Sequence, residues 1–302
     1  MALVAAFANA VASICQRLGV EDAPATNGPS LGLVRHMVQR PIWILGFVIM
    51  ALGYGAQAVA LHLGALNVVQ PLLVGELVIL VFILWLWYST PLRARDLAAA
   101  LATALGLGVF LSISAPSAGT KVPGNALWLV VGLLVAGAVV VLVALGSRGP
   151  AWWRALLLGA GASVGFALLA AITKSMTNLL VAGWTPLFTS WQLYAVAAIG
   201  LTSFVIMQSA FQVGPFATSQ STLILLNPLV SIVIGHVLFG EDLRGGALLT
   251  SLEAVSIAVM LVGALGLSTS PLVASVLQEN EVTHLLKGRG RFARWREREA
   301  GQ

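Results

Sequence analysis

Two acidic residues and one lysine lie in the long apolar stretches of this 302-residue chain. Glu76 stands near the middle of the stretch PLLVGELVILVF, with no lysine or arginine close to it in sequence. A carboxylate inside a membrane is costly unless it is paired, faces water or takes up a proton. Glu76 is therefore the leading candidate for binding a solute or a coupling ion. The alternative is a protonated side chain that only bonds a neighbouring helix. Glu253 and Lys174 are secondary candidates, because anchoring near the membrane interface explains both more simply.

Neutral polar side chains follow the same apolar stretches and could line a cavity together with Glu76. The candidates are Gln57, His62, Gln70, Gln208, Gln212, Gln220 and Asn227. Gln208 and Gln212 are one helical turn apart, and Gln220, Asn227 and Ser231 follow at spacings of seven and four, so each set shares one helix face. The same faces could instead hold helices together, at about 0.6 kcal/mol per contact.

The composition shows what kind of protein must position these side chains. Hydrophobic residues make up 59% of the chain and charged residues only 9%, against roughly a quarter charged in soluble domains. Too few polar groups are present to cover a soluble surface. The single cysteine, Cys15, excludes an internal disulfide. The composition therefore indicates a membrane protein.

Nine apolar stretches have the length of about twenty residues that crosses the hydrocarbon core as a helix. A helix satisfies its own backbone hydrogen bonds in lipid, so the predicted fold is an all-α polytopic membrane bundle. The gaps are short, and no separate soluble domain is expected. The predicted spans are residues 2–18, 42–64, 67–88, 97–115, 126–146, 154–175, 191–213, 216–239 and 248–268.

The distribution of lysine and arginine predicts the orientation, because these residues are retained on the cytoplasmic side. With nine spans and the N-terminus outside, 13 of the 16 basic residues fall on the inner side. We therefore predict an integral protein of the bacterial cell membrane, with an outer N-terminus and a cytoplasmic C-terminus. The basic tail is expected to contact anionic lipid headgroups rather than nucleic acid.

One phrase occurs twice in the chain. ALHLGALNVVQ at residues 60–70 corresponds to AFQVGPFATSQ at residues 210–220, which pairs His62 with Gln212 and Gln70 with Gln220. On this alignment spans 1 to 4 resemble spans 6 to 9, and the two units begin on opposite sides of the membrane. Such inverted repeats place a substrate site between the halves, near the midplane. The alternative is chance recurrence of the small residues that let helices pack closely.

The repeat divides the chain into four predicted parts. They are a first transmembrane repeat at 1–116, a connector with span 5 at 117–150, a second, inverted transmembrane repeat at 151–271 and a basic cytoplasmic tail at 272–302.

The duplicated four-helix unit and two local patterns resemble the drug/metabolite transporter superfamily. The patterns are QPLLVGE at the entry to the third span and LFGEDLRGG at the exit of the eighth. The chain is most similar to the EamA/NIPA-like branch of this superfamily. The similarity lies in the nine spans, in the connecting segment GALNVVQPL and in the sequence SAP at the end of the fourth span. The resemblance covers about residues 1–271 and implies transport of small organic solutes or, in the NIPA-type proteins, a link to magnesium.

Together these features predict a secondary transporter that moves a small organic or amphipathic solute by alternating access. H⁺ or Na⁺ is the candidate coupling ion, and no cofactor or resident metal is expected. The main alternative is a NIPA-like magnesium transporter, although Mg²⁺ prefers more oxygen ligands than two intramembrane acids supply. An alternative of another class is a membrane scaffold or accessory subunit.

The expected partners of the chain are the bilayer and a small solute, and the oligomeric state stays open. The chain contains no H-E-x-x-H, G-x-S-x-G or Walker sequence, so neither an enzyme nor an ATP-driven pump is expected.

Overall fold

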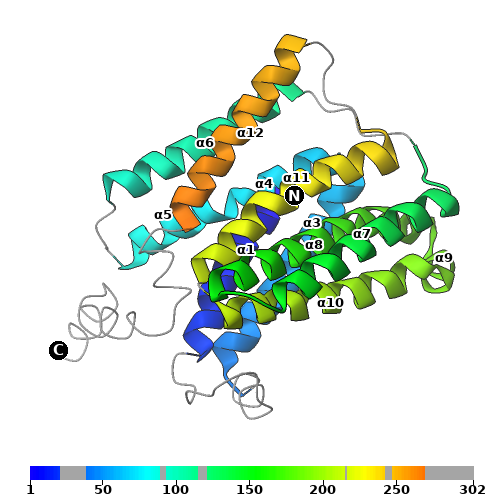
Figure 1. Ribbon diagram of the computed structural model, residues 1–302, viewed down its shortest axis with the longest axis horizontal. Helices are drawn as coiled ribbons and strands as arrows, with labels where there is room; N and C mark the ends of the chain where they lie inside the picture. Colours follow the sequence, from blue (N-terminus) through cyan, green and yellow to red (C-terminus); the bar gives the residue numbers. More distant parts are fainter. Residues whose placement is uncertain (21–38, 89–92, 115–120, 215, 242–246, 269–302) are drawn as a thin grey trace, which may run out of the picture.

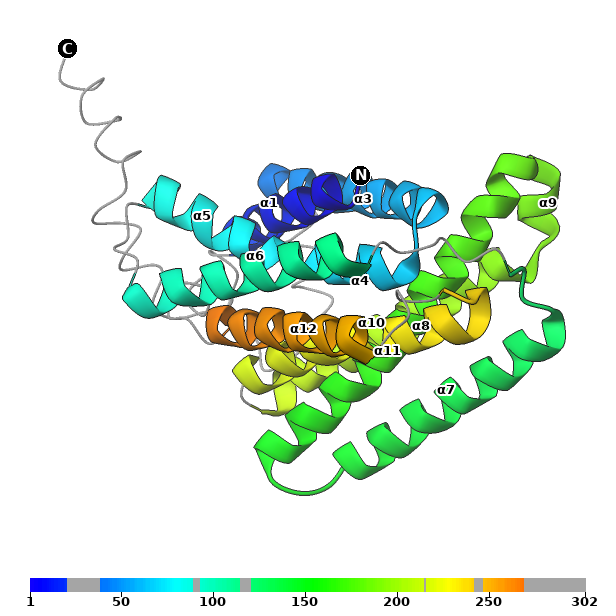
Figure 2. The same ribbon diagram turned by 90° about the horizontal axis from the view of Figure 1, so that it is seen from above.

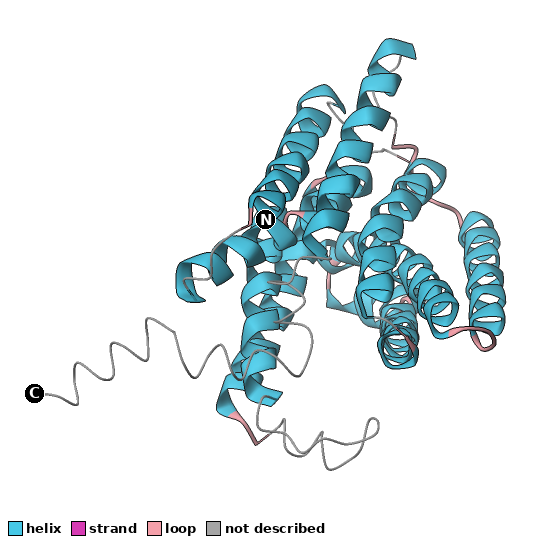
Figure 3. Ribbon diagram, turned by 60° about the vertical axis from the view of Figure 1, so that its left-hand side comes forward, coloured by secondary structure: helices cyan, strands magenta, loops and turns pink. Residues whose placement is uncertain are grey.

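The computed structural model of the chain describes residues 1–20, 39–88, 93–114, 121–214, 216–241 and 247–268. Every regular element in these ranges is a helix, and Figure 3 shows no strand among them. The all-α class predicted from the composition is confirmed. The predicted basic tail, residues 272–302, lies outside the described residues.

The helices are coloured along the chain in Figure 1. They are α1 (Ala2–Val20), α3 (Pro41–Leu63), α4 (Leu66–Val74), α5 (Glu76–Tyr88), α6 (Ala94–Ser114), α7 (Asn125–Gly146), α8 (Ala151–Ala182), α9 (Trp184–Thr189), α10 (Trp191–Val213), α11 (Phe216–Phe239) and α12 (Ala247–Ser268).

Seven helical segments in the described part of the chain are long and apolar enough to cross a membrane. They are Pro41–Leu63, Leu66–Ile83, Ala94–Ile113, Asn125–Gly146, Ala151–Leu180, Ser221–Phe239 and Leu249–Ser268. Two shorter apolar segments, Ala2–Ala12 and Trp191–Met207, belong to α1 and α10. The chain is therefore a polytopic helical membrane protein, and the count of nine spans stays a prediction.

Helix α8 is longer than the span predicted at residues 154–175. It runs from Ala151 to Ala182 and ends at Gly183, whose φ of +130° and ψ of 170° are accessible essentially to glycine alone. The short helix α9 follows directly. Lys174, which the sequence placed at a helix end, therefore lies well inside α8.

The span predicted as one helix over residues 67–88 is interrupted at Gly75. Helix α4 ends at Val74 and α5 begins at Glu76. Pro71, inside α4, has no amide hydrogen, so one helical hydrogen bond is missing before the interruption. The amide of Gly75 bonds the carbonyl of Leu72 at 3.1 Å, a tighter turn than that of an α-helix. The interruption places Glu76 in the first turn of the second segment.

Pairs of helices from distant parts of the chain form the bundle. Helix α1 packs along α3, α8 packs along α10, and α11 contacts both α4 and α8. Helix α7 runs along one edge of the molecule against α8, as Figure 2 shows. Helices α6 and α12 lie side by side in both views and form a separate arm (Figures 1 and 2).

The crossing of α6 and α12 is reciprocal. A methyl group added to Gly106 would lie 2.5 Å from the amide nitrogen of Met260, and one added to Gly263 would lie 2.5 Å from the amide nitrogen of Thr103. Equivalent contacts therefore run in both directions, as at an interface between two copies of one surface. The matched positions, 157 residues apart, are Ala99 and Ser256, Thr103 and Met260, and Gly106 and Gly263.

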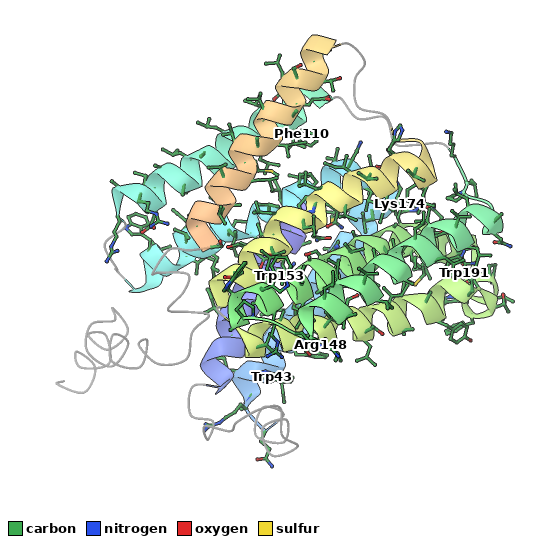
Figure 4. All side chains as sticks on the ribbon, in the orientation of Figure 1. Trp43, Phe110, Arg148, Trp153, Lys174 and Trp191 are labelled. Atoms are coloured by element: carbon green, nitrogen blue, oxygen red, sulfur yellow. The ribbon has the colours of Figure 1, made fainter. Side chains whose placement is uncertain are left out.

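Tryptophans lie toward both ends of the bundle. Figure 4 shows Trp43 and Trp153 toward one end, together with Arg148, and Trp191 toward the other. Aromatic side chains of this kind favour the two membrane–water interfaces. Their positions agree with helices that cross a bilayer from one end of the bundle to the other.

Candidate functional site

A cavity of about 510 Å³ lies between the helices of the two halves of the chain. Its lining residues come from the middle of α1, α3, α8 and α10, from both sides of the α4–α5 interruption, and from α11. Pockets of this size accept small organic ligands. The polar part of the lining consists of Asn9, Tyr54, Gln57, Gln70, Glu76 and Asn227. Four of these residues, Gln57, Gln70, Glu76 and Asn227, are candidates from the sequence.

Glu76 supplies the only carboxylate among the described residues that line the cavity. The side chain is half-buried and forms a hydrogen bond with the side chain of Asn9 in α1. Glu76 directly follows the interruption between α4 and α5 and lines the cavity. Glu76 can therefore offer a negative charge to a molecule in the cavity.

Asn9 is held against α3 at a glycine. A methyl group added to Gly53 would lie 2.9 Å from Oδ1 of Asn9 and 3.0 Å from Cβ of Ala8. Because Gly53 has no side chain, Asn9 fits against α3 and can form its hydrogen bond with Glu76. Asn9 was not a candidate from the sequence. The sequence around Asn9 does not indicate that its side chain contacts Glu76, which lies 67 positions later.

The side-chain amides of Gln70 in α4 and Asn227 in α11 form a hydrogen bond at the same cavity. Nδ2 of Asn227 donates to Oε1 of Gln70 at 3.3 Å. Nε2 of Gln70 and Oδ1 of Asn227 have no hydrogen-bond partner. Both unmet atoms are buried beside the cavity, so a solute with complementary groups could satisfy them only if the two side chains reorient.

Tyr54 is fixed by a contact between α3 and α8. Its hydroxyl and Oγ1 of Thr173 are 2.8 Å apart. The ring of Tyr54 lines the cavity while its polar end is held by the neighbouring helix.

Residues that line the cavity recur at the spacing of the doubled phrase, 150 positions. The recurring pairs are Met50 and Gly200, Tyr54 and Phe204, Gln57 and Met207, Leu73 and Leu223, Val74 and Ile224, and Leu77 and Asn227. The first helix of each half adds two pairs at a spacing of 157, Asn9 with Phe166 and Ala12 with Leu169. Positions that correspond in the predicted repeat alignment therefore line the same cavity.

Lys174 and Glu241 form a buried ion pair at another point of the bundle. Nζ of Lys174 lies 2.5 Å from Oε1 of Glu241, and the two side chains are 7% and 0% exposed. The ring of Phe239 lies 4.8 Å from the same Nζ (Lys174 is labelled in Figure 4). Lys174 is therefore buried and paired, in contrast to the interfacial anchor that the sequence favoured.

The carboxylate of Glu241 also caps helix α4. The amide of Leu66 donates to Oε1 at 2.7 Å and the amide of Asn67 donates to Oε2 at 2.9 Å. These are first-turn amides that a helix cannot satisfy internally. Glu241 was not a candidate from the sequence, and the available signal was the GED turn after α11, in which Gly240 has a φ of +62°.

Glu253 lies away from the cavity, in the arm formed by α6 and α12. It is 1% exposed and precedes Ser256 and Met260 on the same helix face, which packs against α6. Its side chain is therefore buried between helices. The sequence favoured a side chain that extends to the membrane–water interface, and the structure does not show that position. Asp96 occupies the matching position on α6, 157 residues earlier, and is also 1% exposed.

His62 is not among the described residues that line the cavity. Nδ1 of His62 lies 2.7 Å from Oδ1 of Asn178, an exposed contact between α3 and α8. The side chains of Gln208, Gln212 and Gln220 lie outside the part that the structure describes. Within the described residues no group of three or more histidine, cysteine, aspartate or glutamate side chains could hold a metal ion.

Comparison with known proteins yields one relative of similar length. A protein of Corynebacterium glutamicum, named only as uncharacterized, is 26% identical over 237 residues, which cover 77% of this chain and 81% of the relative. No family model matches the chain. No solved structure matches it.

Proposed function

We propose that the chain is a secondary transporter that moves a small organic or amphipathic solute by alternating access. The observation that carries the proposal is the cavity of about 510 Å³, with Glu76 in its wall and corresponding residues of both halves in its lining. A central site built from two related halves can open to either side when the halves exchange their conformations.

Two independent features support an inverted repeat. The lining pairs recur at the spacing of the doubled phrase, and the crossing of α6 and α12 repeats its contacts in both directions. This arrangement is the one that the resemblance to the drug/metabolite transporter superfamily implies. The proposed topology has nine spans, with the N-terminus outside, in the cell membrane of a bacterium, and the basic tail lies on the anionic headgroups of the inner leaflet.

Glu76 is the proposed binding residue for the solute or for a coupling ion, H⁺ or Na⁺. Asn9 orients its carboxylate through the hydrogen bond between them. Gln70 in α4 and Asn227 in α11 also line the cavity, and each has one buried polar atom without a partner. The ion pair of Lys174 and Glu241 holds α4 in place, so it positions Gln70 without lining the cavity.

A transport assay tests the proposal. A screen of solutes in a strain that lacks the protein identifies the compounds to use, and the purified protein in liposomes is then tested for their uptake and efflux. Glu76→Gln removes the charge and keeps the shape, so we expect transport to fall by about tenfold or more, as it does when a charged group bound to a substrate is lost. Glu253→Gln is the matched control, because it makes the same chemical change outside the cavity.

The same assay separates the alternatives. Full transport by Glu76→Gln would remove this carboxylate from the mechanism. Uptake of Mg²⁺ in place of organic solutes would favour the NIPA-like alternative. If no solute or ion moves, and the protein is recovered only with a partner, the chain is a scaffold or accessory subunit.

A further inference from the structure

The two halves contribute chemically different side chains to the cavity. At three of the eight matched positions the first half carries a polar residue and the second half an apolar one, and at one, Leu77 and Asn227, the order is reversed. The three pairs are Asn9 and Phe166, Tyr54 and Phe204, and Gln57 and Met207. The contrast at these three positions gives the cavity one more polar side and one more apolar side, which an amphipathic ligand can use.

We infer that the ligand is an amphipathic organic cation. Its charged group binds at the carboxylate of Glu76 beside Asn9, and its apolar part lies against Phe166, Phe204 and Met207. The inference rests on the proposed site and adds the class of its ligand.

The sign of the charge follows from what lines the cavity. Glu76 is its one carboxylate, and no lysine, arginine or histidine is found among the described lining residues. A carboxylate in a low-dielectric site is strongly stabilised by an opposite charge, whereas an anion would add a second negative charge beside the first. Aromatic rings at Tyr54 and Phe204 can also face a cation, which the negative face of a ring attracts.

The apolar lining residues fit an organic cation better than a metal ion. Mg²⁺ is bound by oxygen ligands and retains several waters, so it would gain nothing from Phe166, Phe204 or Met207. An organic cation with an aromatic or alkyl body would bury that body against them. Each CH₂ group of that body that leaves water makes binding more favourable.

A binding experiment with three matched probes tests the inference. The probes are benzyltrimethylammonium, its neutral carbon isostere (2,2-dimethylpropyl)benzene, in which the charge is absent, and benzenesulfonate, which is an anion. Binding to the purified full-length protein in nanodiscs is measured by equilibrium dialysis, with empty nanodiscs subtracted. We expect the cation to bind at least about tenfold more tightly than the isostere and the anion to bind weakest.

Two variants locate the charge and the apolar contact separately. Glu76→Gln should weaken the cation by about tenfold and leave the neutral isostere unchanged, so that the preference for charge disappears. Phe204→Ala should weaken both probes to a similar degree, because it removes apolar contact and no charge. Glu253→Gln should behave like the unaltered protein. Retained helicity and a single oligomeric form show that each variant is folded.

Several outcomes would overturn the inference. They are equal binding of cation and isostere, unchanged cation binding by Glu76→Gln, and no binding of the cation at all. Counterflow of the same probes in liposomes distinguishes the proposal of transport from the proposal of a cationic ligand. A cation that binds through Glu76 without being moved leaves the site standing and contradicts transport. Movement of a neutral or anionic solute that Phe204→Ala impairs supports transport and contradicts the cation.

Discussion

Nζ of Lys174 lies 2.5 Å from Oε1 of Glu241, and this pair joins α8 to the turn that follows α11. The same carboxylate accepts the amides of Leu66 and Asn67 at the start of α4. Three segments that are far apart in the sequence thus meet at one buried carboxylate. Because both charges are out of water, each depends on the other.

Removing one partner of this pair should destabilise the protein strongly. Lys174→Met leaves a buried carboxylate without its countercharge, and we expect a loss of about 3–5 kcal/mol in the free energy of unfolding. The double variant Lys174→Met, Glu241→Gln should lose less than the sum of the single variants, because no uncompensated charge remains. Unfolding in mild detergent titrated with SDS measures all three. Arg148→Met, an exposed change, should stay within about 0.5 kcal/mol of the unaltered protein.

Gly53→Ala should disturb the site through Asn9. The added methyl group would lie 2.9 Å from Oδ1 of Asn9, so the asparagine must move away from Glu76. We expect weaker solute binding and a loss of about 1–3 kcal/mol in stability, as for overpacking generally. Gly55→Ala is the control, because a methyl group there meets nothing within 4 Å. Equal behaviour of the two variants in a binding assay would contradict the role of Asn9.

The reciprocal crossing predicts that Gly106→Ala and Gly263→Ala have similar effects. Each methyl group would lie 2.5 Å from a backbone nitrogen of the other helix, so the arm of α6 and α12 must open in both cases. A loss of about 1–3 kcal/mol or more is expected for each. Gly108→Ala, which meets nothing within 4 Å, should be neutral or slightly stabilising. A large effect at one glycine and none at the other would argue against a symmetric crossing.

The orientation can be tested on the two ends of α7. Val122 is 92% exposed before this helix, and Ser147 is exposed after it. In a Cys15→Ser background, Val122→Cys should react with an impermeant maleimide added to intact cells. Ser147→Cys should react only after the cells are opened, since the basic residues place that end inside. The reverse labelling pattern would invert the proposed topology.

Local features of the sequence were sufficient to predict much of the architecture. Apolar stretches of membrane length identify helices because each one must satisfy its backbone within a bilayer of fixed thickness. Glu76 was identified as a candidate because a carboxylate is costly in an apolar stretch that crosses the membrane. Described lining residues recur at the same spacing of 150 as the doubled phrase at residues 60–70 and 210–220.

The tertiary structure alone decided which polar residues meet. Asn9 bonds Glu76, Lys174 pairs with Glu241, and Glu253 is buried on α12 far from the cavity that Gln57 and Asn227 line. Both contacts join residues 67 positions apart, and hydropathy along the chain indicates only how deep in the membrane a residue lies. Which neighbour it finds at that depth depends on the rotation and crossing of whole helices, and glycines such as Gly53 and Gly263 set how closely those helices approach.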